Sequence, residues 1–302
     1  MAASSVEAIP TVVYPPRRAR VPAGRASVDH GVLQADCSLL SEMGADRSAP
    51  AMPTGRKAMR RLLEGVRVFE GLSGCNVYLV GSDGDLTLVD AGLAPDPPRI
   101  EAQLEEEGIT PTDIRRIVLT HSHADHTGGA ALLAGRTGAA VLAHAEEVPF
   151  IQGGRRPPSS TAAIRFLFWV LSLLGRGAAT CRVDRVLADG ERLEGSPVLR
   201  VLHCPGHTPG SISLYDPARR VIFCGDALFN YDPTTRKPGL RVSIPLFTSD
   251  NARALESVRM LARLDADILL PGHGEPLMGD AGRRIRELLA EGSKDPAGDR
   301  CG

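Results

Sequence analysis

The chain carries the stretch Thr120-His121-Ser122-His123-Ala124-Asp125-His126-Thr127-Gly128-Gly129, which places three imidazoles and one carboxylate within six consecutive residues. An apolar run at 114–119 predicts a buried strand before it, and 128–133 predicts the start of a helix after it. Neutral imidazole and carboxylate bind zinc-like ions, and the whole chain has only eight histidines. This density indicates a metal site on a strand-to-helix loop rather than solvated loop residues. The spacing suggests two ions, with His121 and His123 on one and Asp125 and His126 on the other.

Composition limits the class of protein. With 302 residues and a formal net charge of -1, the chain can bury one large core, and we expect one domain plus a tail. The balanced charge argues against sequence-blind binding to nucleic acid. The six cysteines have no paired spacing and the N-terminus has no apolar signal-peptide core, so a cytoplasmic location is expected. Cys204 and Cys224 fall in apolar strand patterns and are interpreted as buried structural thiols.

Changes in composition suggest the domain boundaries. Residues 1–60 mix Pro, Ala, Ser and Arg without a period and are expected to be a mostly disordered tail. A single domain is expected at 61–292, followed by a flexible C-terminus at 293–302.

Residues 152–180 look like an apolar helical insertion in this domain. Its run at 161–174 contains Trp169 and is broken by Arg165, so it is too short to span a bilayer. Three interpretations stay open for it: a helix packed in the core, an apolar wall or lid over the site, or a surface for a homodimer or weak membrane-interface contact.

Polar residues follow several predicted strands at the point where each strand ends. The strands at 86–89, 199–202, 221–224 and 268–270 are followed by Asp90, His207, Asp226 and His273, respectively. Loops at strand ends carry chemistry, although spacing alone favours Asp90 as an exposed turn acid. His203 is interpreted as a core histidine and His144 as the first turn of a helix. Further strands are expected at 66–69 and 76–80, and helices at 97–107, 251–264 and 279–290.

The order and type of these residues resemble the metallo-β-lactamase superfamily, whose pattern is an acidic turn, a His-x-His-x-Asp-His loop, a later His, a bridging Asp and a final His. The resemblance covers about 65–290. The segments Pro205-Gly206-His207-Thr208-Pro209-Gly210 and Cys224-Gly225-Asp226-Ala227-Leu228-Phe229 are typical of its glyoxalase II-like branch. The resemblance implies an α/β fold: a four-layer αβ/βα sandwich of two mixed β-sheets with helices on the outer faces.

The resemblance also implies roles for these residues. It assigns His121, His123 and His207 to a first ion, Asp125, His126 and His273 to a second, and Asp226 as the bridge between them. Asp90 would lie behind the ligands and orient their loop. The ions would be two divalent cations, with zinc expected.

The activity that this implies is a dinuclear metal-dependent hydrolase, in which a metal-bridging hydroxide attacks an ester, thioester or lactone carbonyl of a small molecule. Asp125 would be the catalytic residue that holds the nucleophile and moves its proton. Phe229, Tyr231 and Trp169 are the candidate substrate contacts.

Departures from related branches narrow this choice. His123 stands where the oxygen-reducing di-iron branch has Glu. Phe229 stands where quorum-quenching lactonases have Tyr, and the Tyr found two residues after the final His of hydroxyacylglutathione hydrolases is replaced by Glu275. Two alternatives remain: a mononuclear iron persulfide dioxygenase-like oxidoreductase, and a non-catalytic metal-binding or interaction protein on the same fold.

Overall fold

The computed structural model describes residues 58–82, 84–153, 180–195, 197–232 and 237–292, which all lie in one compact unit, Pro53–Gly302. The segments expected as the N-terminal tail, the insertion and the C-terminus lie largely outside these residues. Those expectations, including any contact through 161–174, therefore stay predictions.

The described strands are β1 (Arg60–Leu63), β2 (Val66–Val68), β3 (Tyr78–Ser82), β4 (Asp85–Val89), β5 (Ile114–Val118), β6 (Ala140–His144), β7 (Arg185–Leu187), β8 (Arg192–Leu193), β9 (Leu199–His203), β10 (Ile212–Asp216), β11 (Val221–Gly225), β12 (Leu228–Phe229), β13 (Arg241–Val242), β14 (Ile268–Pro271) and β15 (Leu277–Met278). The described helices are α1 (Pro97–Glu106), α2 (Ala124–Thr127), α3 (Ala130–Thr137), α4 (Val148–Ile151), α6 (Asn251–Leu261) and α7 (Ala281–Gly292), with short 3₁₀ turns η1 (Pro111–Asp113) and η2 (Pro245–Phe247).

Two mixed sheets form the centre of the unit. One has seven strands in the order β1-β2-β3-β4-β5-β6-β7, and the other has six in the order β15-β14-β11-β10-β9-β8. In the first sheet β4, β5, β6 and β7 are parallel neighbours, and in the second β11 and β14 are parallel. The remaining neighbours within these two sheets are antiparallel.

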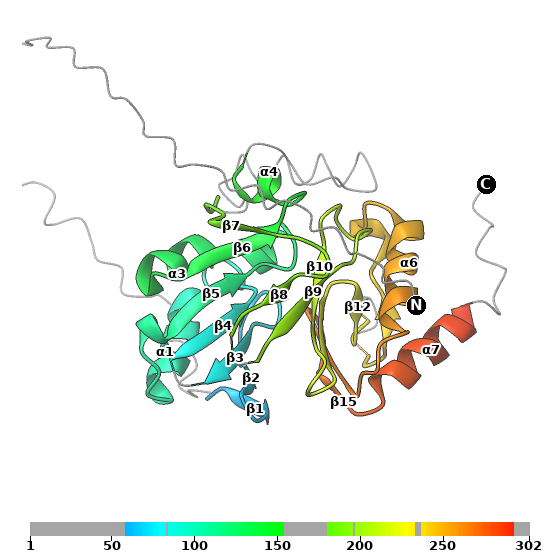
Figure 1. Ribbon diagram of the computed structural model, residues 1–302, viewed down its shortest axis with the longest axis horizontal. Coiled ribbons are helices and arrows are strands. Elements are labelled where there is room, and N and C mark those ends of the chain that lie inside the picture. The colour runs from blue at the N-terminus through cyan, green and yellow to red at the C-terminus, as the bar shows by residue number, and fades with distance from the viewer. Residues whose placement is uncertain (1–57, 83, 154–179, 196, 233–236, 293–302) are drawn as a thin grey trace, which may run out of the picture. The chain divides into compact units, whose positions relative to one another are not determined.

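Alternation along the strands produces four layers. Successive residues of a strand point to opposite faces, and here they enter different hydrophobic clusters: Ile117 packs toward α1 and α3, whereas Val118 packs between the sheets. In the second sheet Phe223 faces the space between the sheets and Ile222 faces α6 and α7. Figure 1 shows α1 and α3 on one side of the paired sheets and α6 and α7 on the other. The expected four-layer sandwich is therefore the observed fold.

Local signals explain most helix positions. Proline opens α1, α3 ends at Gly138 with a left-handed φ of 72°, and the Asp250 side chain caps α6 by accepting from the Arg253 N–H at 3.0 Å. The three helices expected at 97–107, 251–264 and 279–290 correspond to α1, α6 and α7.

Three local expectations were wrong. The first strand was expected at 66–69, but β1 precedes it and pairs with β2, with Arg60 opposite Val68. His144 ends β6 instead of opening a helix, and Asp125 and His126 lie on the single helical turn α2 rather than on an open loop. Short elements of this kind form because neighbouring strands and loops hold them, and local propensity does not report that.

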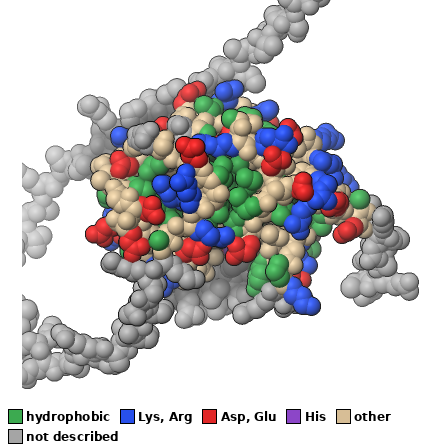
Figure 2. Space-filling view, turned by 90° about the horizontal axis from the view of Figure 1, so that it is seen from below, with side chains coloured by type: hydrophobic (Ala, Val, Ile, Leu, Met, Phe, Trp, Pro, Cys, Tyr) green, Lys and Arg blue, Asp and Glu red, His purple; other side chains and the backbone are tan. Residues whose placement is uncertain are grey.

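The surface of the described residues gives no sign of a membrane span or of a single dominant charge on the face that Figure 2 shows. No helix among these residues is both long and apolar enough to cross a membrane. Figure 2 shows Lys and Arg side chains intermingled with Asp and Glu around a central group of hydrophobic ones. Opposite charges this close cancel at distance.

Candidate metal centre

The strand ends bring the candidate ligands to one edge of the sandwich. Asp90 follows β4 and His121 follows β5, which are parallel neighbours; Asp226 follows β11 and His273 follows β14, which are also parallel neighbours. The carboxyl ends of parallel strands face the same way, which is where α/β sheets place their binding loops. A backbone hydrogen bond joins the two sheets at this edge: the Ile212 N–H, in β10, donates to the Thr120 carbonyl, which follows β5, at 2.9 Å.

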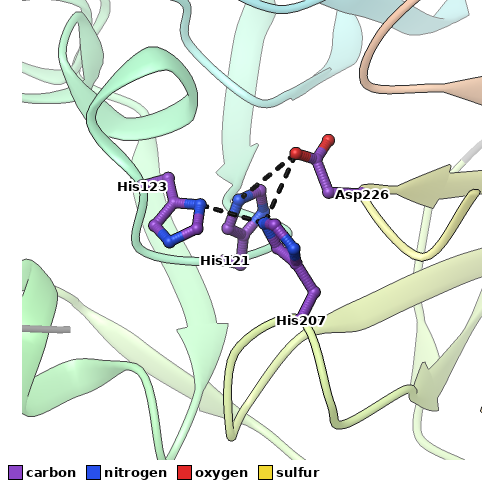
Figure 3. Close-up of side chains that lie close together, drawn as sticks. All are labelled: His121, His123, His207 and Asp226. Carbon is purple, nitrogen blue, oxygen red and sulfur yellow. Dashed lines mark hydrogen bonds and ion pairs between the residues drawn. The ribbon is translucent and has the colours of Figure 1, made fainter. Parts of the chain in front are cut away.

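A first group of candidate ligands consists of His121, His123, His207 and Asp226, whose ligand atoms lie within 4.8 Å of one another. The His207 Nε2 lies 2.9 Å from the His123 Nδ1 and 3.4 Å from the Asp226 Oδ2. The His121 Nε2 lies 3.9 Å from the same oxygen. Figure 3 shows the three imidazole rings and the carboxylate turned toward a common point.

A second group consists of Asp125, His126 and His273, again within 4.8 Å. The His273 Nε2 lies 3.1 Å from the Asp125 Oδ2 and 3.5 Å from the Asp226 Oδ2. The His126 Nε2 lies 3.2 Å from the other Asp226 oxygen, Oδ1. One carboxylate, Asp226, therefore faces both groups, and all seven expected side chains meet in one place.

Hydrogen bonds on the outer side fix which nitrogen of His207 faces the centre. The Thr248 hydroxyl donates to the Ile244 carbonyl at 2.7 Å, so the Ser243 hydroxyl donates to Thr248. The Ser243 oxygen, 2.7 Å from the His207 Nδ1, must then accept from it. This chain protonates Nδ1 and leaves the lone pair of the inward Nε2 free for a cation.

Hydrogen bonds also fix which ring nitrogen carries the proton in His126 and His121. The Asp90 carboxylate can only accept, so the His126 Nδ1, at 2.8 Å, carries the proton. The Thr120 hydroxyl donates to Asp90 at 2.9 Å, so its oxygen accepts from the His121 Nδ1 at 3.1 Å. In the neutral form of each ring, the inward Nε2 atom therefore presents a lone pair, in the arrangement that metal-binding histidines adopt.

Buried atoms without partners test whether a cation fits here. Among the described residues, the His121 Nε2, the His126 Nε2 and the Asp226 Oδ1 are buried without a hydrogen-bond partner. Buried polar atoms are almost always satisfied. These three belong to the two groups, and nitrogen and carboxylate donors are the ligands that zinc-like cations take. The residues therefore fit divalent ions.

Burial and charge separate the two groups electrostatically. Burial lowers the pKa of His121 well below its usual value and that of His207 to about 3, so both imidazoles are neutral near pH 7. Burial alone would also lower the pKa of His273, but the carboxylates of Asp226 and Asp125 outweigh it and raise this pKa to about 9. The first group offers neutral lone pairs, whereas the second holds a proton that a cation would displace.

A profile described as "Metallo-beta-lactamase superfamily" matches residues 71–273, which include all seven candidate ligands. The chain belongs to the metallo-β-lactamase superfamily. The resemblance that the sequence showed is thereby confirmed, and membership implies a site for divalent metal ions.

Individual relatives agree with this membership. The "Probable metallo-hydrolase YflN" of Bacillus subtilis (strain 168) is 30% identical over 230 residues, which cover 72% of this chain and 85% of that protein. A hydroxyacylglutathione hydrolase of Anaeromyxobacter dehalogenans is 35% identical over 199 residues, covering 65% of this chain and 60% of that protein. The crystal structure of a metallo-beta-lactamase family protein from Thermus thermophilus matches with a TM-score of 0.59 at 29% identity, covering 78% of this chain and 81% of that one.

Asp90 supports this metallo-β-lactamase superfamily site from behind. It is 2% exposed, and its carboxylate accepts from the Thr120 N–H at 2.8 Å as well as from the Thr120 hydroxyl and His126. The spacing-based interpretation of Asp90 as an exposed turn acid is therefore wrong. Its φ of 64° is unusual for a residue with a side chain, and the hydrogen bonds hold it in that conformation.

Gly272 shows how closely the superfamily ligand loops pack. A Cβ at this position would overlap the Asp226 Oδ1 and would lie 2.8 Å from the His126 Cε1. Its N–H donates to the Gly225 carbonyl at 2.8 Å, so the turn before His273 lies directly on the turn that carries Asp226. Only glycine permits this approach.

The three candidate substrate contacts differ in what the structure shows of them. Phe229 is 5% exposed, and its ring packs edge-on against His273 with centroids 5.1 Å apart. Phe229 therefore supports the His273 ring, and its contact with substrate stays a prediction. Tyr231 is half-buried beside the Gly274 backbone and remains a candidate. Trp169 lies outside the described residues.

Among the residues that the structure describes, two other clusters contain metal-binding residue types. His144, Glu146 and His203 have ligand atoms within 4.8 Å, but the two imidazoles are stacked with planes 17° apart. Parallel stacked rings cannot direct in-plane lone pairs to one point. Cys75 lies beside Asp90 and His126, and burial raises its pKa to about 12, so the thiol stays protonated. Neither arrangement competes with the centre described above.

Sequence reasoning missed the residues that orient the ligands. Ser243 and Thr248 are 36 and 41 positions from His207, and no pattern near them marks a contact with it. Thr120 adjoins His121 in the sequence, so its hydroxyl is a local signal that could have indicated a residue that orients the ligand. The residues that hold the final ligand loop, described below, were also missed.

Proposed function

We propose that this chain is a hydrolase that uses two divalent ions, with zinc expected, to cleave an ester, thioester or lactone of a small molecule. The single observation that carries the proposal is that Asp226 faces both ligand groups, with Oδ1 3.2 Å from the His126 Nε2 and Oδ2 3.4 Å from the His207 Nε2. When bound, two such ions lower the pKa of a shared water to near neutrality and polarise a carbonyl oxygen.

Differences in exposure indicate the direction from which substrate approaches. The side chains of Asp125 and His273 are 34% and 26% exposed, whereas those of His121, His207 and Asp226 are at most 4% exposed. The buried residues, with His126 at 0% exposure, form the floor of the site, and Asp125 and His273 of the second group line its mouth. The reacting carbonyl therefore approaches over Asp125.

Asp125 is the residue best placed to move a proton. Burial alone would raise the pKa of this carboxyl, but His126 and His273 hold it below its usual range, so it is ionised at neutral pH. An ionised carboxylate at the mouth can hold the attacking water and accept its proton, then return it to the leaving group. In the metal-free protein the His273 Nε2, 3.1 Å away, holds this carboxylate in place.

The substrate class is supported by residue chemistry and by relatives. Hydroxyacylglutathione hydrolases, to which the chain is similar, cleave by their name an acyl bond. Here Glu275 follows His273 by two residues and forms an ion pair with Arg60 at 2.9 Å, which places a carboxylate where those enzymes have a tyrosine. We therefore propose that this chain cleaves a different acyl substrate. We also propose that it acts in the cytoplasm, where the free thiols of its four described cysteines would persist.

A metal-dependent activity panel tests the proposal. Metal-depleted protein, reloaded with zinc or with iron, is assayed on thioesters, lactones, aryl esters and a persulfide. We expect hydrolysis that requires about two zinc ions per chain and falls about 10²- to 10⁴-fold in Asp125→Asn. Asp113→Asn, at the opposite end of β5, is the control and should retain activity. Oxygen consumption with one iron and a persulfide would instead establish the dioxygenase alternative.

A further inference from the structure

The backbone that carries His273 is held by an unusual number of hydrogen bonds. The Pro271 carbonyl accepts from the Tyr78 hydroxyl at 2.7 Å and from the Asn76 Nδ2 at 3.0 Å. The His273 carbonyl accepts from the Asn230 N–H at 3.1 Å. The flanking glycine carbonyls, at 272 and 274, are also bonded, so every carbonyl from 271 to 274 has a donor.

Asn76 supplies three of these bonds. Its N–H donates to the Gly272 carbonyl at 2.7 Å, and its Nδ2 donates to the carbonyls of Pro271 at 3.0 Å and Gly274 at 2.7 Å. Both amide protons are used, and both partners can only accept, which fixes the orientation of the amide. Asn76 thus brackets His273 from both sides.

These bonds cross from one sheet to the other. Asn76 lies two residues before β3 in the seven-stranded sheet, whereas His273 follows β14 in the six-stranded sheet. Without the side-chain amide, the ligand loop would keep its bonds with Asn230 and Gly225 in its own half of the fold. From the first half it would keep the Tyr78 hydroxyl on Pro271 and the Asn76 N–H on Gly272, but the Gly274 carbonyl would lose its donor. Asn76 is therefore a direct link between the first sheet and the ligand loop.

His273 depends on its backbone more than the fully buried histidines of the site do. The side chains of His121, His126 and His207 are at most 2% exposed and are wedged in place, whereas that of His273 is 26% exposed. Glycines flank it on both sides, and Gly274 has a φ of 91°. A glycine-flanked, partly exposed ligand loses its position readily when its backbone is released.

We propose that Asn76 is a positioning residue that sets the affinity of the second ion by holding the His273 backbone. This inference rests on the proposed dinuclear site and deepens it. Removing a group that orients a metal ligand weakens binding by about 10- to 100-fold. Because the three hydrogen bonds of Asn76 all end on the 271–274 backbone and none on a residue of the first group, the first ion keeps its affinity.

The test uses Asn76→Ala together with Asn76→Leu, which keeps a branched side chain of four heavy atoms without any donor. Gln103→Ala is the matched control, since its buried amide also clamps backbone, accepting from the Glu70 N–H and donating to the Glu70 carbonyl, both at 2.9 Å, away from His273. Metal-depleted full-length proteins are titrated with zinc against a competing chelator, and thermal melts verify folding.

The expected result is stepwise binding of two ions to the wild type and to Gln103→Ala, with the second step weakened about 10- to 100-fold in both Asn76 variants. Folded Asn76 variants that bind both ions as tightly as wild type would overturn the inference and leave the proposed function intact. Equal weakening of both ions would overturn it too, because it denies selectivity. A wild type that binds fewer than two ions would remove the proposed function and this inference together.

Discussion

Replacing Asp90 by Asn is expected to weaken the second ion selectively, because Asp90 fixes the proton of His126. Asn keeps the size of the side chain and tolerates the φ of 64°. Its Oδ1 can still accept from the Thr120 N–H, which lies 2.8 Å from the present Oδ1. Its Nδ2 cannot accept from the His126 Nδ1, now 2.8 Å from a carboxylate oxygen. The variant thus removes one charge-assisted hydrogen bond with little change in shape.

The magnitude follows from that bond. A hydrogen bond to a charged group contributes about 1.5–3 kcal/mol, and each tenfold change in affinity corresponds to about 1.4 kcal/mol. The second ion should therefore bind about 10- to 100-fold more weakly. The first ion is affected less, because His121 reaches Asp90 only through the Thr120 hydroxyl.

The assay is a zinc titration of metal-depleted Asp90→Asn against a chelator. Asp280→Asn is the matched control, because Asp280 is also an aspartate with positive φ, 55°, but is exposed and pairs with Arg283. Asp280→Asn should bind both ions normally. If Asp90→Asn also bound both ions with wild-type affinity, the assignment of Asp90 as the residue that orients His126 would be refuted.

Three further predictions concern the same centre. Ser243→Ala removes the acceptor that lies 2.7 Å from the His207 Nδ1. The first ion should bind more weakly, by about tenfold at most, since neutral hydrogen bonds contribute about 0.5–1.5 kcal/mol. Unchanged affinity for the first ion in a chelator titration would contradict this. Gly272→Ala places a Cβ against the Asp226 Oδ1. It should lower the free energy of unfolding by about 1–3 kcal/mol and weaken the binding of both ions, as thermal melts and metal analysis would show. Normal binding of both ions would argue against this packing. Lowering the pH from 8 to 6 should release the second ion first. His273, with a pKa of about 9 in the metal-free protein, regains its proton, whereas His207, with a pKa of about 3, stays neutral. Metal content after dialysis at each pH would show the reverse order if the electrostatic account were wrong.

The fold and the convergence of the seven candidate ligands could be predicted because local patterns indicate both. A short apolar run predicts a strand, and a polar residue such as Asp226 or His273 directly after it marks the edge where strands end. The His-x-His-x-Asp-His spacing then identifies a family whose fold is known. Boundaries were less certain, as β1 shows, because a short edge strand forms only when its partner is present.

The residues that orient the ligands could not be predicted in the same way. Asn76 and Ser243 act across 197 and 36 positions on His273 and His207, respectively, and each is an ordinary polar residue in its own segment. Their roles depend on a closed loop or on two sheets that meet, which are tertiary facts. The burial of Phe229 is another such fact, because it depends on the packing of its ring against His273, which the sequence around Phe229 does not indicate.

The number of divalent ions bound per chain tests the central claim most directly. Elemental analysis of full-length protein, depleted of metal and then equilibrated with a small excess of zinc at pH 8, should give two ions per chain, because Asp226 faces two complete groups of donors. A value of one, or of none, would contradict the account.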